Sequence, residues 1–224
     1  VKALVGSGGV ALIACFALGR AQEVLSILDA AMSSGALPKF PVWIDGMIDK
    51  VNEVYRSHGR LSLGENFHEV RTEGWEREEV VSRIQEQPSV VVATSGMLTG
   101  GPMVFYAQQL ARQMNVRLFF SGYVDEDSPG GQALRLLGPG GVPAEITVPD
   151  DYGVRQTIQV RVAPDRVRLS AHADQNDLVG IIERYEPENV VLVHSEAKAR
   201  EALTTRLSRG RFRVSADPRS FALS

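Results

Sequence analysis

The chain has 224 residues, of which 44% are hydrophobic and 23% charged, and its formal net charge is −3. These values indicate a globular protein of one or two domains, and they exclude nucleic-acid binding through overall charge alone. One cysteine excludes an intrachain disulfide and fits a reducing compartment, so we expect a cytoplasmic protein; the longest apolar stretch, 10–18, is too short to cross a membrane.

The first part of the chain alternates between strand and helix patterns with short connections. In chain order, the expected elements are a strand at 10–14, a helix at 18–32 stopped by Gly35, a strand at 41–45, a helix at 48–55 with Ile48, Val51, Val54 and Tyr55 on one side, loop with a short helix at 56–76, a helix at 76–87, a strand at 89–94, a helix from Pro102 to Met114 and a strand at 116–120. This alternation predicts a parallel-sheet α/β unit over residues 1 to about 150.

The pattern changes after the glycine-rich residues 138–141. The elements expected from there are extended segments at 145–148 and 157–169, a helix at 175–185, a strand at 190–193 and a helix at 198–207. We place a domain boundary between about 150 and 166. Because the chain begins at Val1 and enters structured sequence at once, we expect Val1 to lie inside a larger protein.

A glycine-rich turn follows the strand at 89–94. Ser95, Gly96, Gly100 and Gly101 come just before Pro102, where the next helix is expected to start. Free backbone N–H groups and the positive end of a helix dipole suit a phosphate group. A tight turn whose glycines only allow close packing explains the same residues equally well, and no Gly-Lys-Ser/Thr follows to make a Walker A loop.

Residues 121–131 also follow a strand and contain three acidic residues that could bind a metal ion. The simpler interpretation is a solvated loop in which Ser128 or Asp127 caps the helix starting at Pro129. Cys15 lies in an apolar run and is expected in the core.

Two of the four histidines stand where site residues are common. His172 ends an extended segment two residues before Asp174, so it could stabilise a phosphate or donate a proton, or simply bond to local backbone. Asp174 is expected to cap the next helix. His194 ends an apolar strand, but zinc takes about four ligands and the sequence has no H-x-H-x-D-H run, so chemistry alone does not make His194 a ligand. The remaining histidines, His58 and His68, are expected at the surface.

Six segments, in this order, resemble the β-CASP family of metallo-β-lactamase-fold nucleases. They are FALGRAQE at 16–23, PVWIDGM at 41–47, SGMLTGG at 95–101, GYVDEDSPG at 122–130, SAHAD at 170–174 and VHSE at 193–196. The last two resemble motifs B and C of the family, and the likeness spans residues 8 to 207. The segments are most similar to the RNA 3′-end-processing branch, with ribonuclease J more distant, and a histidine in motif C favours RNA over the DNA-repair branch.

The resemblance implies an α/β fold. It places a parallel-sheet, Rossmann-like β-CASP domain at 1–158 and the C-terminal portion of a metallo-β-lactamase αββα fold at 159–224. It also implies that His194 binds one zinc of a two-zinc centre and that His172 contacts the scissile phosphate. Ser195 departs from the glycine usual after the motif C histidine. The family's first four motifs and motif A precede the β-CASP segment and are absent here, so we expect the chain alone to hold little or no zinc and to be inactive.

The resulting hypothesis is part of a zinc-dependent ribonuclease that hydrolyses single-stranded RNA in mRNA processing or decay. Ser95, Gly96, Gly100 and Gly101 would contact RNA phosphates, and an N-terminal metallo-β-lactamase half would complete the centre. An apolar surface left by that half could be covered in a homodimer. One alternative is a non-catalytic RNA-binding scaffold paired with an active paralogue, although both histidines are retained. Another is an unrelated α/β enzyme that binds a nucleotide at 95–101.

Overall fold

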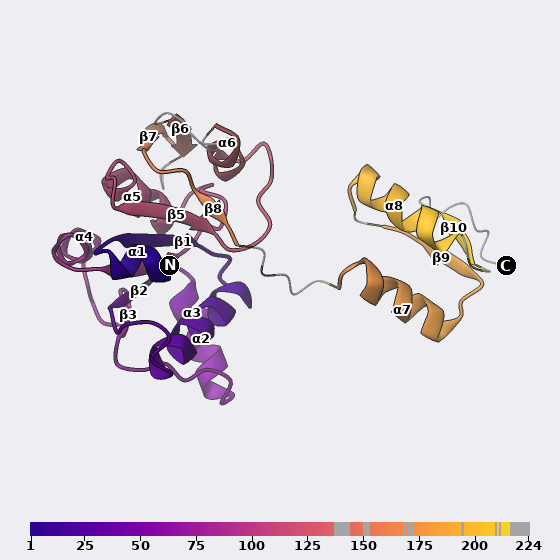
Figure 1. The fold of residues 1–224 in the computed structure, drawn as a ribbon, viewed down its shortest axis with the longest axis horizontal. Coiled ribbons are helices and arrows are strands. Elements are labelled where there is room, and N and C mark those ends of the chain that lie inside the picture. Colours follow the sequence, from indigo (N-terminus) through magenta and orange to yellow (C-terminus); the bar gives the residue numbers. More distant parts are fainter. Residues whose placement is uncertain are drawn as a thin grey trace. The chain divides into compact units, whose positions relative to one another are not determined.

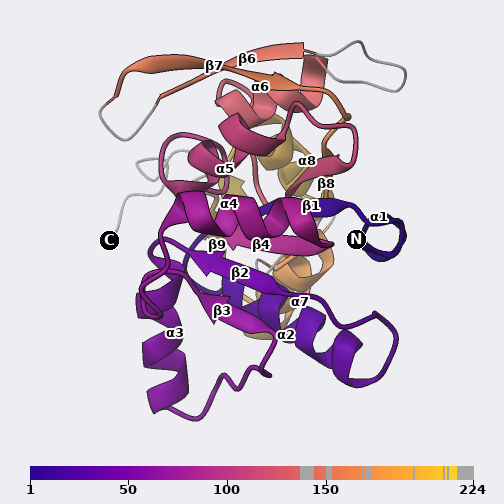
Figure 2. The same ribbon diagram turned by 90° about the vertical axis from the view of Figure 1, so that its left-hand side faces the viewer.

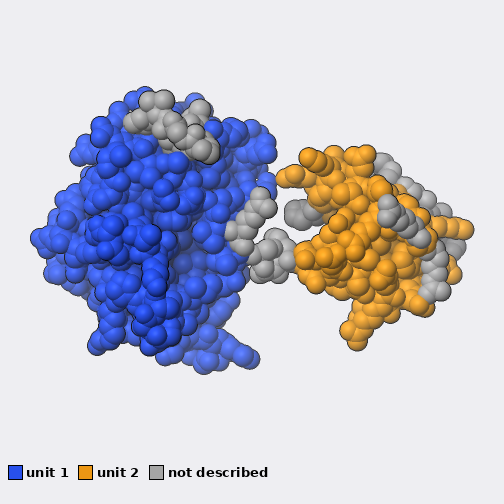
Figure 3. Space-filling model, viewed as in Figure 1, with its two compact units in different colours: residues 1–169 blue, residues 170–224 orange. Residues whose placement is uncertain are grey.

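The computed structural model describes residues 1–136, 144–149, 153–167, 169, 173–193, 195–208, 210 and 212–215. The chain divides into two compact units, residues 1–169 and 170–224, coloured separately in Figure 3. Both His172 and His194 lie outside the described residues. Among the helices that the structure describes, none has the length and apolar character needed to span a membrane.

Unit 1 is organised around a six-stranded parallel sheet with the order β3-β2-β4-β1-β5-β8 (Figure 1). The strands are β1 (Val10–Ala14), β2 (Val42–Asp45), β3 (Phe67–Glu69), β4 (Ser89–Ala93), β5 (Val116–Phe120) and β8 (Asp165–Arg166). Every residue of β1, β2 and β4 is buried, as expected for parallel strands covered on both faces. The α/β fold with a parallel sheet, expected from the sequence, is confirmed.

Helices cover both faces of this sheet. They are α1 (Lys2–Gly6), α2 (Arg20–Ser33), α3 (Ile48–Ser57), α4 (Arg77–Glu86), α5 (Pro102–Leu110) and α6 (Pro129–Leu136). Because side chains alternate along a strand, Leu12 enters the core shared with α4 and α5, whereas Ile13 enters the core shared with α2. Figure 2 shows α4 and α5 apart from α2 and α3, on different sides of the sheet.

An antiparallel hairpin adds to the α5 face of unit 1. It consists of β6 (Ala144–Pro149) and β7 (Arg155–Val160). The side chains that alternate along its inner face are buried in the same core as α5. They are Ile146, Val148, Ile158 and Val160. The chain then pairs β8 with β5 before unit 1 ends at Leu169.

Three local expectations were wrong. Residues 56–76 contain β3, which is too short to show an alternating pattern, and its His68 is only 31% exposed because its ring lies 4.9 Å from the Trp43 ring. The helix expected to reach Met114 ends at Leu110, since the Ala111 carbonyl accepts the Arg161 N–H instead of continuing the helix.

The third expectation concerns α3, in which the sequence indicates one apolar side. The buried face of this helix includes two polar residues. Asp49 and Asn52 are 4% and 0% exposed, whereas Val54 is 57% exposed. Ile48 is buried on the apolar side as the sequence indicates, but the buried face is turned toward Asn52, which accepts a hydrogen bond from Gln22 and donates one to Glu69. Tertiary contacts here outweigh the apolar periodicity of the helix.

Unit 2 contains α7 (Gln175–Tyr185), β9 (Asn189–Val191), α8 (Ala197–Leu207) and β10 (Arg213–Ser215). Strands β9 and β10 pair in parallel. Within its described residues, the buried hydrophobic side chains are Val179, Val190 and Leu207.

Candidate functional site

The carboxyl ends of the central strands stand level at one edge of the sheet in unit 1. Ala93 is the register partner of both Ala14 and Asp45, and Ala14 is also the partner of Phe120. We call this the C-terminal edge; its loops are 15–19, 46–47, 94–101 and 121–128. Ligands of open α/β sheets bind outside the carboxyl ends of the strands, so this edge is the candidate site.

The turn between β4 and α5 is braced by its own hydroxyl groups. Ser95 Oγ accepts the Thr99 N–H at 2.8 Å and lies 3.2 Å from Thr99 Oγ1. The Met103 N–H donates to the Thr94 carbonyl at 2.6 Å, which joins the first turn of α5 to the end of β4. The helix starts at Pro102 as expected, and Ser95 remains half-buried at the edge.

The three glycines of the turn differ in what surrounds them. A Cβ on Gly96 would lie 3.2 Å from the Cys15 carbonyl carbon, and one on Gly101 would lie 3.1 Å from the Thr94 oxygen. A Cβ on Gly100 would meet nothing within 4 Å. Close packing therefore explains Gly96 and Gly101, whereas the backbone at Gly100 borders open space.

A buried ion pair lies beside this turn. Asp45, at the end of β2, is 0% exposed and accepts hydrogen bonds from Arg77 Nε at 2.7 Å and Nη2 at 3.3 Å. The Tyr106 hydroxyl also donates to Asp45, at 3.0 Å. Burial and then the Asp45 charge raise the pKa of Tyr106, so the phenol stays a hydrogen-bond donor. The sequence signal for this pair was an acid ending an apolar strand, but nothing local identified its partner.

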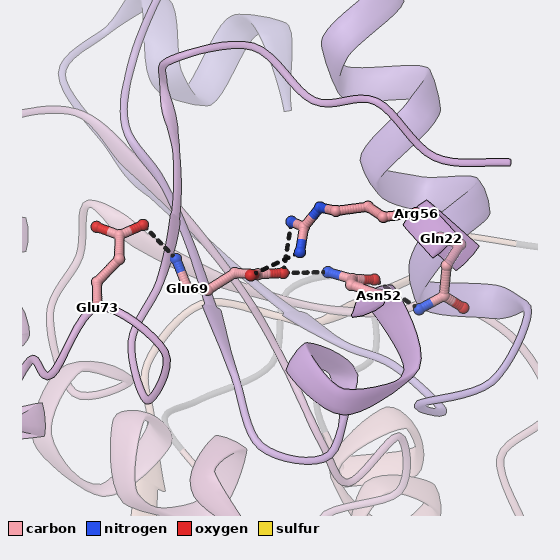
Figure 4. A network of polar contacts seen from close by, with 5 residues as sticks. All are labelled: Gln22, Asn52, Arg56, Glu69 and Glu73. Carbon is pink, nitrogen blue, oxygen red and sulfur yellow. Dashed lines mark hydrogen bonds and ion pairs between the residues drawn. The ribbon is translucent and has the colours of Figure 1, made fainter. Parts of the chain in front are cut away.

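A second carboxylate is held by a network that joins three elements (Figure 4). Glu69, at the end of β3, accepts hydrogen bonds from Arg56 at 2.9 and 2.8 Å and from Asn52 at 2.8 Å. Gln22 of α2 donates to Asn52 at 2.9 Å, and the Glu69 N–H donates to Glu73 at 2.9 Å. With its carboxylate satisfied in this way, Glu69 serves to fix α2 and α3 against the sheet.

Asp49 is a third buried carboxyl group. Neither of its oxygens has a hydrogen-bond partner of normal geometry, although the backbone N–H groups of Arg71 and Thr72 lie close enough to favour its charge. Burial, followed by the charges of Glu69 and Asp45, raises the pKa of Asp49 to about 7. The residue lines a pocket of about 270 Å³. The other lining residues are Gly46, Lys50, Glu53, Arg71 and Thr72.

Several residues singled out in the sequence have structural roles. Ser128 caps α6 by accepting the Gly131 N–H at 3.1 Å, and Asp174 caps α7 by accepting the Asn176 N–H at 2.7 Å, both as expected. Cys15 is fully buried, as expected, and burial raises the pKa of its thiol to about 12.

The described side chains do not form a metal site. Among the described residues, no three or more His, Cys, Asp or Glu side chains come together to hold a metal ion. Two buried carboxylates at the ends of β2 and β3, Asp45 and Glu69, are neutralised by arginines. The described donors therefore do not fit a zinc centre by themselves, and His194 lies outside them.

Unit 2 has an apolar hollow of about 630 Å³ between α7, β9 and α8. Its lining includes Leu178, Val191 and Val193, of which Val193 is 63% exposed. Exposed apolar surface of this kind makes the hollow a candidate binding surface.

Two family models match this chain, one after the other along the sequence. The Beta-Casp domain model matches residues 21–132, and the model of the Zn-dependent metallo-hydrolase RNA specificity domain matches 157–218. Transcription termination factor FttA of Pyrococcus abyssi is 31% identical over 221 residues, which are 90% of this chain and 33% of that protein. FttA of Thermococcus kodakarensis is 29% identical over 208 residues, 85% of this chain and 31% of that protein.

An RNase J-like protein of Methanocaldococcus jannaschii is 30% identical over 207 residues, 88% of this chain and 45% of that protein. The chain thus spans about a third of the length of the two FttA proteins. The models match in the order that the six sequence segments predict, the first within the parallel-sheet unit and the second across the end of that unit and unit 2. The chain belongs to the β-CASP family of metallo-β-lactamase-fold proteins.

Proposed function

We propose that the chain is the substrate-binding part of a zinc-dependent ribonuclease that hydrolyses RNA phosphodiester bonds. The observation that carries this proposal is the match of residues 157–218 to an RNA specificity domain of zinc-dependent metallo-hydrolases. That range contains both His172 and His194. The similarity to an RNase J-like protein over 88% of the chain supports the same activity.

The proposal divides the work between two parts of the chain. Residues 1–158 would grip the RNA strand, and residues 159–224 would complete a metallo-β-lactamase domain that supplies the other metal ligands. The apolar hollow of unit 2 supports this division. Val191 and Val193 are exposed there, and covering them with another polypeptide would be stabilising.

Each residue then has a stated task. Bound zinc would supply a nucleophilic hydroxide near neutral pH. His194 would hold the metal, and His172 would contact the scissile phosphate and stabilise its developing charge. Phosphates along the strand would lie on the turn at the start of α5, which Ser95 braces and where the backbone at Gly100 borders open space.

The direct test measures zinc content, RNA binding and RNA cleavage with the purified 224-residue chain. We expect salt-dependent binding of a labelled single-stranded RNA, less than one zinc per chain by mass spectrometry, and no cleavage. Failure to bind RNA would contradict the gripping role of residues 1–158. A fully metallated chain that degrades RNA unaided would contradict the division between two parts.

A second candidate is a non-catalytic RNA-binding scaffold. Arginines neutralise Asp45 and Glu69, so these two carboxylates of unit 1 offer no free ligand to a metal ion. The two candidates differ in one outcome. If a separately produced metallo-β-lactamase domain restores cleavage when mixed with the chain, and His172→Ala abolishes the restored activity, the scaffold is excluded.

A further inference from the structure

Exposed apolar side chains gather at the C-terminal edge of unit 1. Phe16 follows β1, Met47 follows β2 and Tyr123 follows β5, and they are 39%, 64% and 52% exposed. Leu18, in the same loop as Phe16, is 72% exposed. Because the strands end level with one another, these side chains border one surface, and such a concentration indicates a binding surface.

The Phe16 ring is held in place by two glycine-containing loops. Its Cδ2 atom lies 3.3 Å from the position of a Cβ on Gly96 and 4.0 Å from that of a Cβ on Gly122. A larger residue at Gly96 would crowd this ring. Phe16 therefore packs against the backbone of these loops while it remains 39% exposed, as an aromatic residue at a binding surface would.

Polar groups suited to a phosphate backbone adjoin these rings. The open backbone at Gly100 belongs to the same turn as Gly96, against which the Phe16 ring packs. Beside Tyr123, the exposed Arg166 donates from Nε to the Gly122 carbonyl at 3.0 Å. Aromatic faces next to a positively charged side chain are the combination with which proteins bind single-stranded nucleic acid, bases on the rings and phosphates beside them.

We propose that Phe16 and Tyr123 stack against unpaired bases of single-stranded RNA whose phosphates lie on the turn at 95–101. This inference rests on the proposed function and adds a contact to the bases. A ring face accepts any base, so the surface would tolerate many sequences. Met47 and Leu18, being aliphatic, would border the rings without stacking.

The test is binding of a fluorescein-labelled twelve-nucleotide oligouridine, followed by anisotropy at several salt concentrations. We expect Phe16→Ala and Tyr123→Ala each to weaken binding by roughly 5- to 150-fold. Phe16→Leu should weaken binding nearly as much as Phe16→Ala. Phe16→Trp should retain the affinity of the parent chain, and its tryptophan fluorescence should be quenched when RNA binds. The salt dependence should stay the same in all variants, because no phosphate contact is removed.

Met114→Ala is the matched control, because Met114 is 70% exposed but precedes β5 at the opposite edge of the sheet. Its affinity should equal that of the parent chain. Equal affinity of the parent, Phe16→Ala and Tyr123→Ala chains would overturn the stacking surface and leave the proposed function standing. Absence of RNA binding by the parent chain would overturn both. Parent-like affinity of Phe16→Leu would also overturn stacking, since it would show that apolar bulk alone suffices. Tyr123→Ala tests the same surface independently, in case Phe16→Ala disturbs folding.

Discussion

Unit 1 and unit 2 differ in how completely they bury their apolar side chains. In unit 1, two layers of helices enclose a sheet whose central strands are buried at every position. In unit 2, the described residues bury Val179, Val190 and Leu207, and Val193 stays 63% exposed. The difference teaches that unit 1 encloses its core on both faces of a sheet, whereas the described residues of unit 2 leave apolar side chains exposed, as a binding surface would.

The largest expected effect breaks the core of unit 1. Leu12 is 0% exposed, so Leu12→Ala should lower the free energy of unfolding by about 2–5 kcal/mol. Both tryptophans, Trp43 and Trp75, belong to unit 1, so urea unfolding followed by tryptophan fluorescence reports this unit. Leu207→Ala in unit 2 should leave that transition in place. Equal shifts for both variants would show one cooperative unit instead of two.

The second prediction concerns pH and the buried carboxyl group of Asp49. Its pKa of about 7 in the folded chain exceeds the unfolded value of 3.8, so the folded state binds more protons between these values. Stability of unit 1 should therefore fall as pH rises from about 4 to about 7 and change little above that.

Asp49→Asn should remove this slope and raise stability at pH 8 by up to about 4 kcal/mol, because each pKa unit corresponds to about 1.4 kcal/mol. The charged groups around Asp49 are Asp45, Arg56 and Glu69, the neutral phenol of Tyr106 lies nearby, and Lys50, Glu53 and Arg71 line its pocket. Glu53→Gln, an exposed acid on the same helix, is the control and should keep the slope. The same pH profile for parent and Asp49→Asn chains would refute the assignment.

The smallest expected effect concerns the helix cap of α7 in unit 2. Asp174 caps α7 by accepting the N–H groups of Asn176 and Asp177 at 2.7 and 2.9 Å. Asp174→Ala should destabilise this helix by about 1 kcal/mol, measured by amide hydrogen exchange of residues 175–185. Exchange in unit 1 should not change. Faster exchange in β1 would show that the two units are energetically coupled.

Local patterns in the sequence predicted much of the fold. The buried strand at 10–14 and the helix stop at Gly35 followed from apolar runs and a glycine, and the caps Ser128 and Asp174 followed from short polar side chains before helices. These features depend on residues close together in the chain, which is why one sequence suffices to find them.

The carboxylate clusters could not be found in this way. Asp45 meets Arg77 and Tyr106 only because the sheet order brings β2, α4 and α5 together. In the same way, Asn52 of α3 is buried because it finds Glu69 on a strand too short to be recognised. The two candidate histidines were found through family resemblance, and His172 and His194 lie outside the described residues.

The place of β1 in the sheet has a consequence for synthesis of the protein. This strand emerges from the ribosome before its two neighbours, β4 and β5, with Val10 opposite Ser89 and Val116. This fully apolar strand therefore remains unpaired until most of unit 1 has been translated. Such long-range pairing slows folding and leaves the nascent chain open to wrong associations, so coding changes that delay translation between β1 and β5 should lower the yield of native protein.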